Sequence, residues 1–149
     1  NASTATAPAH LSDQLCFALT VATKAVAGAY RTRLSPLGLT YPQYLVLLAL
    51  WERDGRTVGE LGEAVRFDSG TLSPLLRRLE QAGHVTRQRM DEDERRVRIA
   101  LTDTGRALEP RAAQVRLAVE ASTGLAAGEF VDLRERLLRL ADAVGHGGA

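Results

Sequence analysis

The chain has 149 residues, 45% hydrophobic and 25% charged, a composition typical of one compact globular domain. No apolar run approaches the roughly 18 residues of a membrane span, and residues 1–10 lack the features of a signal peptide, so we expect a soluble cytoplasmic protein. A net charge of +1 gives no support for nucleic-acid binding, which must be argued from the order of the elements. The single cysteine, Cys16, cannot form a disulfide within the chain.

Two apolar helices are expected in the first third of the chain. Ser12 is a plausible N-cap for the first, whose apolar residues recur at helical spacing until Ser35 and Pro36 interrupt them. The second helix follows Thr40, which offers a capping hydroxyl, and has Pro42 in its first turn. Its many leucines predict that it is buried.

A short helix, a turn and a longer helix come next. The short helix is expected over residues 57–65, with a threonine cap. The longer one ends at Gly83 and starts either near Thr71 or at Asp68. If the helix starts near Thr71, Pro74 lies in its first turn, where proline is tolerated. If it starts at Asp68, a local distortion of the helix is expected at Pro74.

Two paired strands are then expected, because the apolar period changes from 3.6 to 2 at His84 and stays so to Leu101. The wholly charged stretch 91–95 between them is expected to be an exposed hairpin tip.

The remainder of the chain is expected to be helical. Thr102 caps a helix through about Glu120, with Pro110 as a candidate kink, and residues 124–128 interrupt the pattern before a final amphipathic helix that reaches Val144.

This order predicts a mainly α-helical fold with a small β-hairpin wing, a winged helix-turn-helix in which the second helix of the pair enters the DNA major groove. We expect a single domain over 1–149 with its DNA-binding lobe at 40–101. The first and last helices look too apolar for one small domain to cover both, so 11–35 and 103–145 are expected to form a dimer.

The start of the longer helix is the expected DNA reader. Small polar residues there allow close approach to bases and phosphates, and two arginines further along can reach phosphates. In the wing, Arg95 is a candidate minor-groove probe held by the carboxylate of Asp93, because arginine suits a narrow, negative groove. The alternatives are a solvated helix face and a solvated hairpin tip. The candidate DNA-binding residues are Asp68, Ser69, Gly70, Thr71, Ser73, Arg77, Arg78, Asp93 and Arg95.

Four motifs carry a family resemblance. They are Leu15-Cys16-Phe17, Leu39-Thr40-Tyr41-Pro42-Gln43-Tyr44, Phe67-Asp68-Ser69-Gly70-Thr71-Leu72 and Asp93-Glu94-Arg95. With them the chain resembles the MarR family of winged-helix repressors, specifically the one-cysteine type of its OhrR branch, the organic hydroperoxide sensors. The resemblance covers nearly all of residues 12–105. It implies a homodimer that places one recognition helix in each half of a palindromic operator in double-stranded DNA.

The resemblance also implies a redox sensor in which Cys16 is the peroxide-reactive thiol and Tyr30 and Tyr41 hydrogen-bond it. Those bonds and a nearby helix start would favour the thiolate. Cys16 and Tyr30 are 14 residues apart, roughly 21 Å along one straight helix, so Tyr30 would have to come from the other subunit. Without the motif, Cys16 would be taken for a small core residue and both tyrosines for packing residues.

Oxidation of Cys16 would give a sulfenic acid. With no second cysteine, it must be capped by a small thiol, cyclise with a backbone nitrogen or oxidise further, and we expect a mixed disulfide with a low-molecular-weight thiol. Relatives with a resolving cysteine form an intersubunit disulfide instead, and Thr20 stands where some relatives have a tyrosine. Oxidation of Cys16 is expected to lower the affinity of the protein for its operator.

Two other functions remain open. One is a MarR-type repressor released by a small aromatic effector, with Cys16 uninvolved. The other is a thiol peroxidase that would turn over peroxide at Cys16. Because the chain lacks the strand-helix alternation of thioredoxin-like folds, we expect that the protein is not an enzyme. The widely spaced His10, His84 and His146 predict no metal site, and we expect no cofactor.

Overall fold

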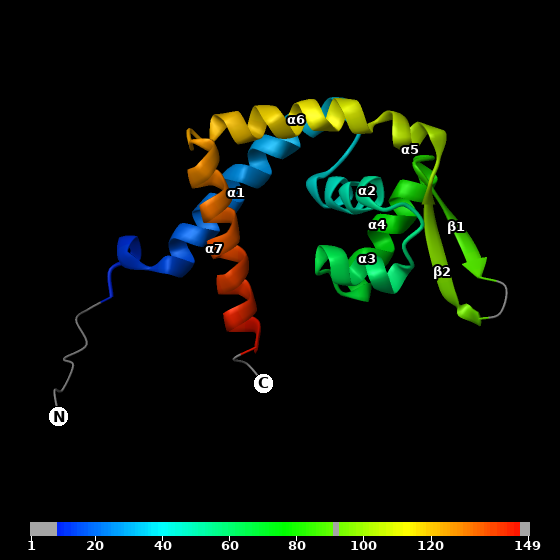
Figure 1. The fold of residues 1–149 in the computed structure, drawn as a ribbon, viewed down its shortest axis with the longest axis horizontal. Coiled ribbons are helices and arrows are strands. Elements are labelled where there is room, and N and C mark those ends of the chain that lie inside the picture. The colour runs from blue at the N-terminus through cyan, green and yellow to red at the C-terminus, as the bar shows by residue number, and fades with distance from the viewer. Residues whose placement is uncertain (1–8, 91–92, 147–149) are drawn as a thin grey trace. The chain divides into compact units, whose positions relative to one another are not determined.

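The structure is a computed structural model that describes residues 9–90 and 93–146, with side chains described for 9–90 and 96–145 (Figure 1). The chain divides into two compact units after Val115. The elements of the first unit are η1 (Leu11–Asp13), α1 (Leu15–Leu34), η2 (Ser35–Leu37), α2 (Tyr41–Glu52), α3 (Val58–Val65), α4 (Ser69–Gln81), β1 (Val85–Met90), β2 (Asp93–Leu101), α5 (Asp103–Ala107) and the first half of α6 (Glu109–Ser122). The second unit holds the rest of α6 and α7 (Ala127–His146).

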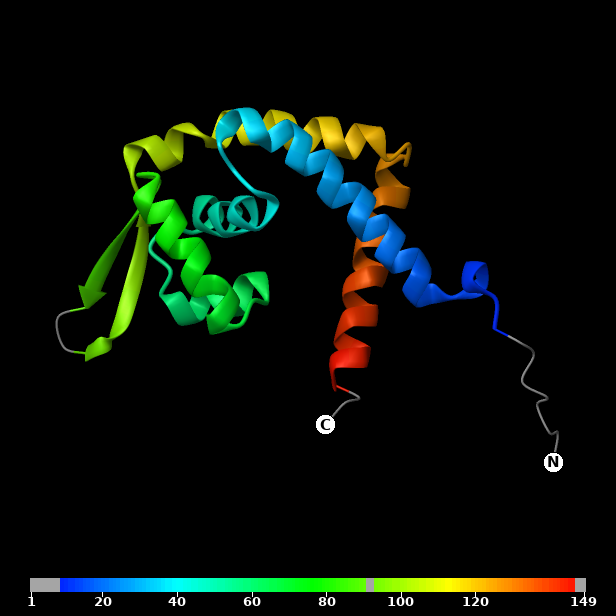
Figure 2. The same ribbon diagram turned by 180° about the vertical axis from the view of Figure 1, so that it is seen from behind.

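The predicted fold class, mainly helical with a two-stranded antiparallel hairpin, is confirmed. Within the first unit the hairpin projects from the helices as a ribbon, and the view from behind shows the same arrangement (Figure 2). In the described part of the chain, no helix is both long and apolar enough to cross a membrane.

The start of α1 differs from the prediction. Ser12 lies in the single 3-10 turn η1 and does not cap the long helix. The residue before α1 is Gln14, whose extended backbone (φ −86°, ψ 124°) separates the turn from the helix and whose side chain makes no capping hydrogen bond. The prediction of a Ser12 cap was wrong for this reason, and Cys16 is the second residue of α1.

The start of α2 agrees with the prediction. Thr40 and Gln43 form a capping box, in which the Gln43 N–H donates to Thr40 Oγ1 at 3.3 Å and the Thr40 N–H donates to Gln43 Oε1 at 2.9 Å. Upstream, the chain turns at Gly38, whose φ of +72° suits a residue without a Cβ. These local features fix where α2 begins.

The helix-turn-helix pair follows from two caps. Thr57 Oγ1 accepts the Glu60 N–H at 3.1 Å to start α3, and Asp68 caps α4. Of the two starts left open by the sequence, near Thr71 and at Asp68, the one at Asp68 is observed. Pro74 lies inside α4, which nevertheless continues to Gln81.

The paired strands of the hairpin are longer than predicted. β1 and β2 pair antiparallel from Val85 with Leu101 to Met90 with Asp93, with an irregularity in register after Arg89. Asp93 thus begins β2, although residues 91–95 were predicted to form the hairpin tip, because the irregular pair of Met90 with Asp93 extends the ladder. Residues 91–92 lie outside the described residues.

Backbone contacts hold the wing to the segment just before α3. The Ile99 N–H donates to the Arg56 carbonyl at 2.9 Å, and Thr57 forms an isolated antiparallel bridge with Arg98. The segment before α3 therefore acts as a short third strand, which fixes the wing to the start of α3.

The core of the first unit is built mainly from leucines of α2 and α4. The spacing of those in α4 places them on one face of the helix. The largest fully buried side chains are Leu34, Leu47, Leu50, Leu61, Leu72, Leu76, Leu79, Ile99, Val46 and Val85.

The helix predicted to run from Thr102 to Glu120 is broken in two. Thr102 caps α5 as predicted, with its Oγ1 accepting the Gly105 N–H at 3.1 Å. The break at Leu108 replaces the candidate kink because Pro110 has no N–H for the carbonyl four residues earlier and its ring would collide with that carbonyl in a continuous helix.

Candidate functional site

The first turn of α4 presents small polar residues to solvent. Asp68 Oδ1 accepts the Thr71 N–H at 2.7 Å, and this hydrogen bond is the main reason that the pKa of Asp68 is lowered. The carboxylate is thus used to start the helix. All the predicted contact residues of this turn are exposed: Asp68, Ser69, Gly70, Thr71 and Ser73.

The predicted phosphate contacts, Arg77 and Arg78, are also exposed on α4. Next to them Glu80 forms an ion pair with Arg87 of β1, with 3.7 Å between Oε2 and Nε. This pair joins the end of α4 to the wing, and the sequence reasoning did not identify it, because an ion pair between separate elements leaves no local pattern.

The wing carries the second predicted contact. Asp93 and Arg95 lie in β2, but their side chains fall outside the described ones, so the minor-groove probe stays a prediction. Arg89, Arg96 and Arg98 are exposed on the described part of the hairpin, which gives it a basic surface.

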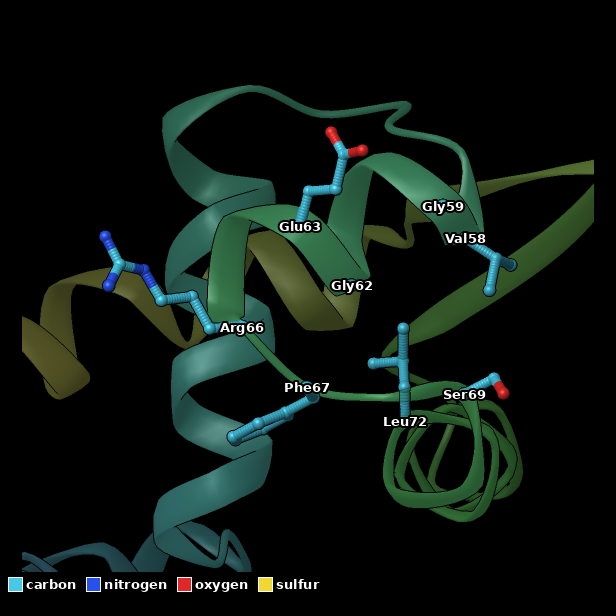
Figure 3. Close-up of a pocket in the computed structure, with 8 residues that line it drawn as sticks. All are labelled: Val58, Gly59, Gly62, Glu63, Arg66, Phe67, Ser69 and Leu72. Atoms are coloured by element: carbon cyan, nitrogen blue, oxygen red, sulfur yellow. The ribbon is translucent and has the colours of Figure 1, made fainter. Parts of the chain in front are cut away.

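A cavity of about 450 Å³ lies between α3 and the start of α4 (Figure 3). In the close-up Glu63 points outward from α3 and Arg66 points outward from the end of that helix, while Leu72 points up between α3 and α4. The cavity is lined by Val58, Gly59, Gly62, Glu63, Arg66, Phe67, Ser69 and Leu72.

Cys16 is exposed near the start of α1. One turn later Thr20, the residue that departs from the family pattern, donates its hydroxyl to the Cys16 carbonyl at 2.8 Å. Cys16 and Tyr30 both belong to the uninterrupted helix α1, which keeps them roughly 21 Å apart along its axis.

The two predicted sensor tyrosines lie together. The ring of Tyr30 on α1 is 5.2 Å from that of Tyr41 on α2, measured between centroids, and is also 5.2 Å from that of Tyr44. Partial burial raises the pKa of Tyr41, because desolvation disfavours the charged phenolate.

A second cavity, of about 500 Å³, lies beside Tyr41 at the junction of α1 and α2. Arg31 is the one charged residue among the described residues that line it, and most of the others are small or apolar. The lining residues are Ala27, Arg31, Ser35, Gly38, Leu39, Thr40, Tyr41 and Pro42.

The aromatic cluster continues along α2. The ring of Tyr44 lies 6.4 Å from that of Trp51, and the Trp51 indole N–H donates to the Gly105 carbonyl at 3.0 Å. Neither Trp51 nor Gly105 was singled out from the sequence. The sequence signal that could have drawn attention to Gly105 is its place three residues after the helix cap Thr102.

Both units expose large apolar side chains on their helices. In the first unit Leu15 is 61% exposed and Val21 is 49% exposed. In the second unit the exposed apolar side chains are Leu117, Val131, Leu133, Leu137, Leu138 and Val144. Among described residues, no three His, Cys, Asp or Glu side chains are grouped so as to hold a metal ion.

The family model described as Transcriptional regulator SarA/Rot matches residues 29–109, more than half of the 149 residues. The chain belongs to this family. The SarA/Rot regulators are MarR-like winged-helix proteins, so the resemblance read from the sequence motifs is confirmed. As a member of the family, the protein is a transcriptional regulator.

Two relatives are similar over most of the chain. The HTH-type transcriptional regulator TtmR of Methylorubrum extorquens is 47% identical over 135 residues, which cover 91% of this chain and 69% of TtmR. The Organic hydroperoxide resistance transcriptional regulator of Bacillus subtilis is 47% identical over 105 residues, which cover 70% of this chain and 71% of that protein.

A solved structure of reduced AbfR bound to DNA, from a protein of Staphylococcus epidermidis, has the same fold. Its TM-score is 0.79 at 35% identity, and the match covers 93% of this chain and 95% of that chain. The SarA/Rot chain is thus similar both to a regulator of hydroperoxide resistance and to a DNA-bound regulator described by its redox state.

Proposed function

We propose that this SarA/Rot regulator is a repressor that senses organic hydroperoxides by oxidation of Cys16 and then releases its operator. The observation that carries the proposal is the pairing of Tyr30 with Tyr41, whose rings are 5.2 Å apart. Two phenols in one cluster offer two hydrogen-bond donors to a sulfur that approaches them. The hydroperoxide regulator of Bacillus subtilis, at 47% identity, supports the same assignment.

The working form in this proposal is a homodimer in which residues 1–149 act as one domain. The exposed apolar side chains of α1, such as Leu15 and Phe17, need a partner surface, as do those of α7. Because Cys16 and Tyr30 are separated along α1, the tyrosines that meet each thiol come from the partner subunit.

The chemical step uses Cys16 and one hydroperoxide molecule. The sulfur attacks an oxygen of the peroxide, an S–O bond forms, the O–O bond breaks, and the alkoxide leaves and takes a proton to become an alcohol. The sulfenic acid then condenses with a small cellular thiol to give a mixed disulfide and water. The chain contains one cysteine, so an intramolecular disulfide is not an available product.

The DNA contacts of the proposal are the exposed first turn of α4, with Arg77, Arg78 and the wing residues Asp93 and Arg95. The helix N-terminus adds a partial positive charge that attracts phosphate. A two-fold axis would place two recognition helices about 34 Å apart, one helical turn of DNA. A bulky group on Cys16 would repack the dimer helices and change that spacing.

The test is a gel shift with a duplex selected from a random pool by the reduced protein. Cumene hydroperoxide with excess cysteine is expected to abolish binding of the wild type and to leave Cys16→Ser bound. Retention of the operator by the treated wild type, or equal release by Cys16→Ser, would contradict the proposal.

A second candidate function is a repressor released by a small aromatic effector. The cavity beside Tyr41 favours it, because Arg31 would pair with a carboxylate while apolar neighbours contact the ring. In that case salicylate would release the operator from Cys16→Ser as readily as from the wild type.

A further inference from the structure

Four aromatic side chains form a continuous row from α1 to the far end of α2. The rings of Tyr30, Tyr41 and Tyr44 are in mutual contact, with 5.2 Å from the Tyr30 centroid to each of the other two and 6.4 Å between those of Tyr41 and Tyr44. Tyr44, only 2% exposed, extends the row to Trp51 at 6.4 Å in an edge-to-face arrangement. Two of these residues are the proposed sensor tyrosines, so the row begins at the proposed redox site.

The other end of the row meets the wing. The Trp51 indole N–H donates to the Gly105 carbonyl at 3.0 Å, although the two residues are 54 positions apart. Gly105 belongs to α5, immediately after β2, and a Cβ on it would lie 2.1 Å from the His84 carbonyl oxygen. His84 immediately precedes β1. Gly105 is thus wedged where both wing strands end.

Hydrogen bonds join the two strands at the base of the wing. The carbonyl of His84 accepts the Thr102 N–H at 3.0 Å, so the residue before β1 is bonded to the residue after β2. Gly105 in turn donates its N–H to Thr102 Oγ1 at 3.1 Å. A displacement of Gly105 therefore displaces the ends of both strands.

From this arrangement we infer that Trp51 is a positioning residue that transmits repacking of the sensor tyrosines to the wing. The inference rests on the proposed function and adds the route by which the signal travels. When the sulfur that accepts from Tyr30 and Tyr41 becomes part of a disulfide, the tyrosine rings lose an acceptor and repack. Closely packed rings pass such a change to their neighbours, because a packed interior has no free space to absorb it.

The path of these contacts also determines which subunit's wing responds when one Cys16 is oxidised. The tyrosines that meet a given thiol belong to the partner subunit in the proposed dimer, and the contacts from Tyr30 to Gly105 all lie within one chain. Oxidation of one subunit's Cys16 therefore acts on the wing of the other subunit.

The first experiment measures operator affinity before and after treatment with cumene hydroperoxide and cysteine, for wild type and Trp51→Phe. Phenylalanine keeps a ring against Tyr44 but removes the indole N–H. Coupling between distant sites is typically about 5–150-fold, and we expect the wild type to weaken about tenfold or more on oxidation. The loss in Trp51→Phe is expected to be smaller by about fivefold, the usual effect of one hydrogen bond between neutral groups.

Thr57→Val is the matched control. It removes a neutral hydrogen bond of similar length, 3.1 Å to the Glu60 N–H, from the same lobe but outside the row. Both redox forms of this variant should weaken by one factor, so that the ratio of their affinities stays that of the wild type. An unchanged ratio in Trp51→Phe, or an equal change in Thr57→Val, overturns the inference.

Fluorescence provides a second measurement that does not depend on the variant folding. Trp51 is the only tryptophan in the chain, so its emission reports on the far end of the row directly. We expect oxidation to shift the emission of the wild type and not that of Cys16→Ser. An unchanged emission in oxidised protein that has released DNA overturns the inference.

A third measurement separates the two proposals. Tyr30→Leu in the reduced protein, without peroxide, is expected to shift the Trp51 emission through Tyr44, and an unchanged emission overturns the row as a route. If peroxide fails to release wild-type protein from DNA, the proposed sensor function fails, and this result on the reduced protein still decides whether Tyr30 and Trp51 are coupled.

Discussion

Substitution of Gly105 by alanine is expected to be strongly destabilising, although alanine normally favours a helix. The added Cβ would lie 2.1 Å from the His84 carbonyl oxygen and 3.3 Å from Leu101 Cδ2, and real Cβ atoms essentially never lie closer than 3.0 Å to another heavy atom. To lengthen this contact from 2.1 to 3.0 Å, α5 must move away from His84, the residue before β1, by about 0.9 Å. The atom closer than 3.0 Å, the His84 carbonyl oxygen, belongs to the backbone and cannot turn aside as the end of a flexible side chain would.

The size of the effect follows from the hydrogen bonds around this contact. The Trp51 indole bond to Gly105 and the Thr102 bond to His84 are each 3.0 Å long, so a shift of that size takes them beyond hydrogen-bonding distance. Loss of these two bonds, which leaves the donor and acceptor of each without their partner, costs about 2–3 kcal/mol. The reduced entropy of the unfolded chain offsets about 0.5 kcal/mol. We therefore expect a net loss of about 2 kcal/mol.

Thermal and urea unfolding at one fixed protein concentration measure this difference. A loss of about 2 kcal/mol corresponds to a fall in Tm of roughly 4–8 °C for a chain of this size. Gly59→Ala is the control, because a Cβ there meets only Thr57 Oγ1 at 3.9 Å and the residue lies in α3. It should leave stability unchanged or raise it by up to about 1 kcal/mol. Equal stability of the two variants would refute the packing argument.

Three further predictions concern the caps, the wing base and the DNA contacts. Thr40→Ala removes half of the capping box with Gln43 and should cost about 1 kcal/mol of unfolding free energy in urea titrations, whereas Thr40→Ser should cost less. Burial lowers the pKa of His84 below its usual 6.5, so the unfolded chain binds the proton more readily; stability is complete above about pH 6.5 and falls as the pH drops through the folded pKa. His84→Gln should lose less stability between pH 7 and 5, and parallel pH profiles for the two proteins would exclude this cause. Arg77→Ala should weaken binding equally across operator sequences and lower the slope of log affinity against log salt by about 1, while an unchanged slope would exclude a phosphate contact.

Features encoded by neighbouring residues were predictable from the sequence. Thr40 and Thr57 cap helices as expected, because a cap depends on residues three positions away. The two paired strands were also identified from alternation, which reflects the buried face that holds Val85 and Ile99. The Ser12 cap was wrong because the backbone of Gln14 is extended, and sequence gives little information on one dihedral pair.

Contacts between distant residues were not predictable from pattern. The bond from Trp51 to Gly105 depends on packing of α5 against α2, and the Arg87 ion pair depends on how β1 lies beside α4. The choice of Tyr30 and Tyr41 as sensor residues came from family resemblance, and the contact between their rings was not predicted. The roles of Cys16 and the DNA-contacting residues stay predictions.

The two faces of α4 have separate tasks in this chain. Its buried leucines hold the helix in the lobe, whereas Ser69, Thr71 and Ser73 face solvent at its start. Substitutions on the exposed face therefore carry little cost in stability. A regulator built in this way can diverge toward new target sequences after gene duplication while its scaffold stays under unchanged selection, so operator preference should vary much faster among its descendants than the fold.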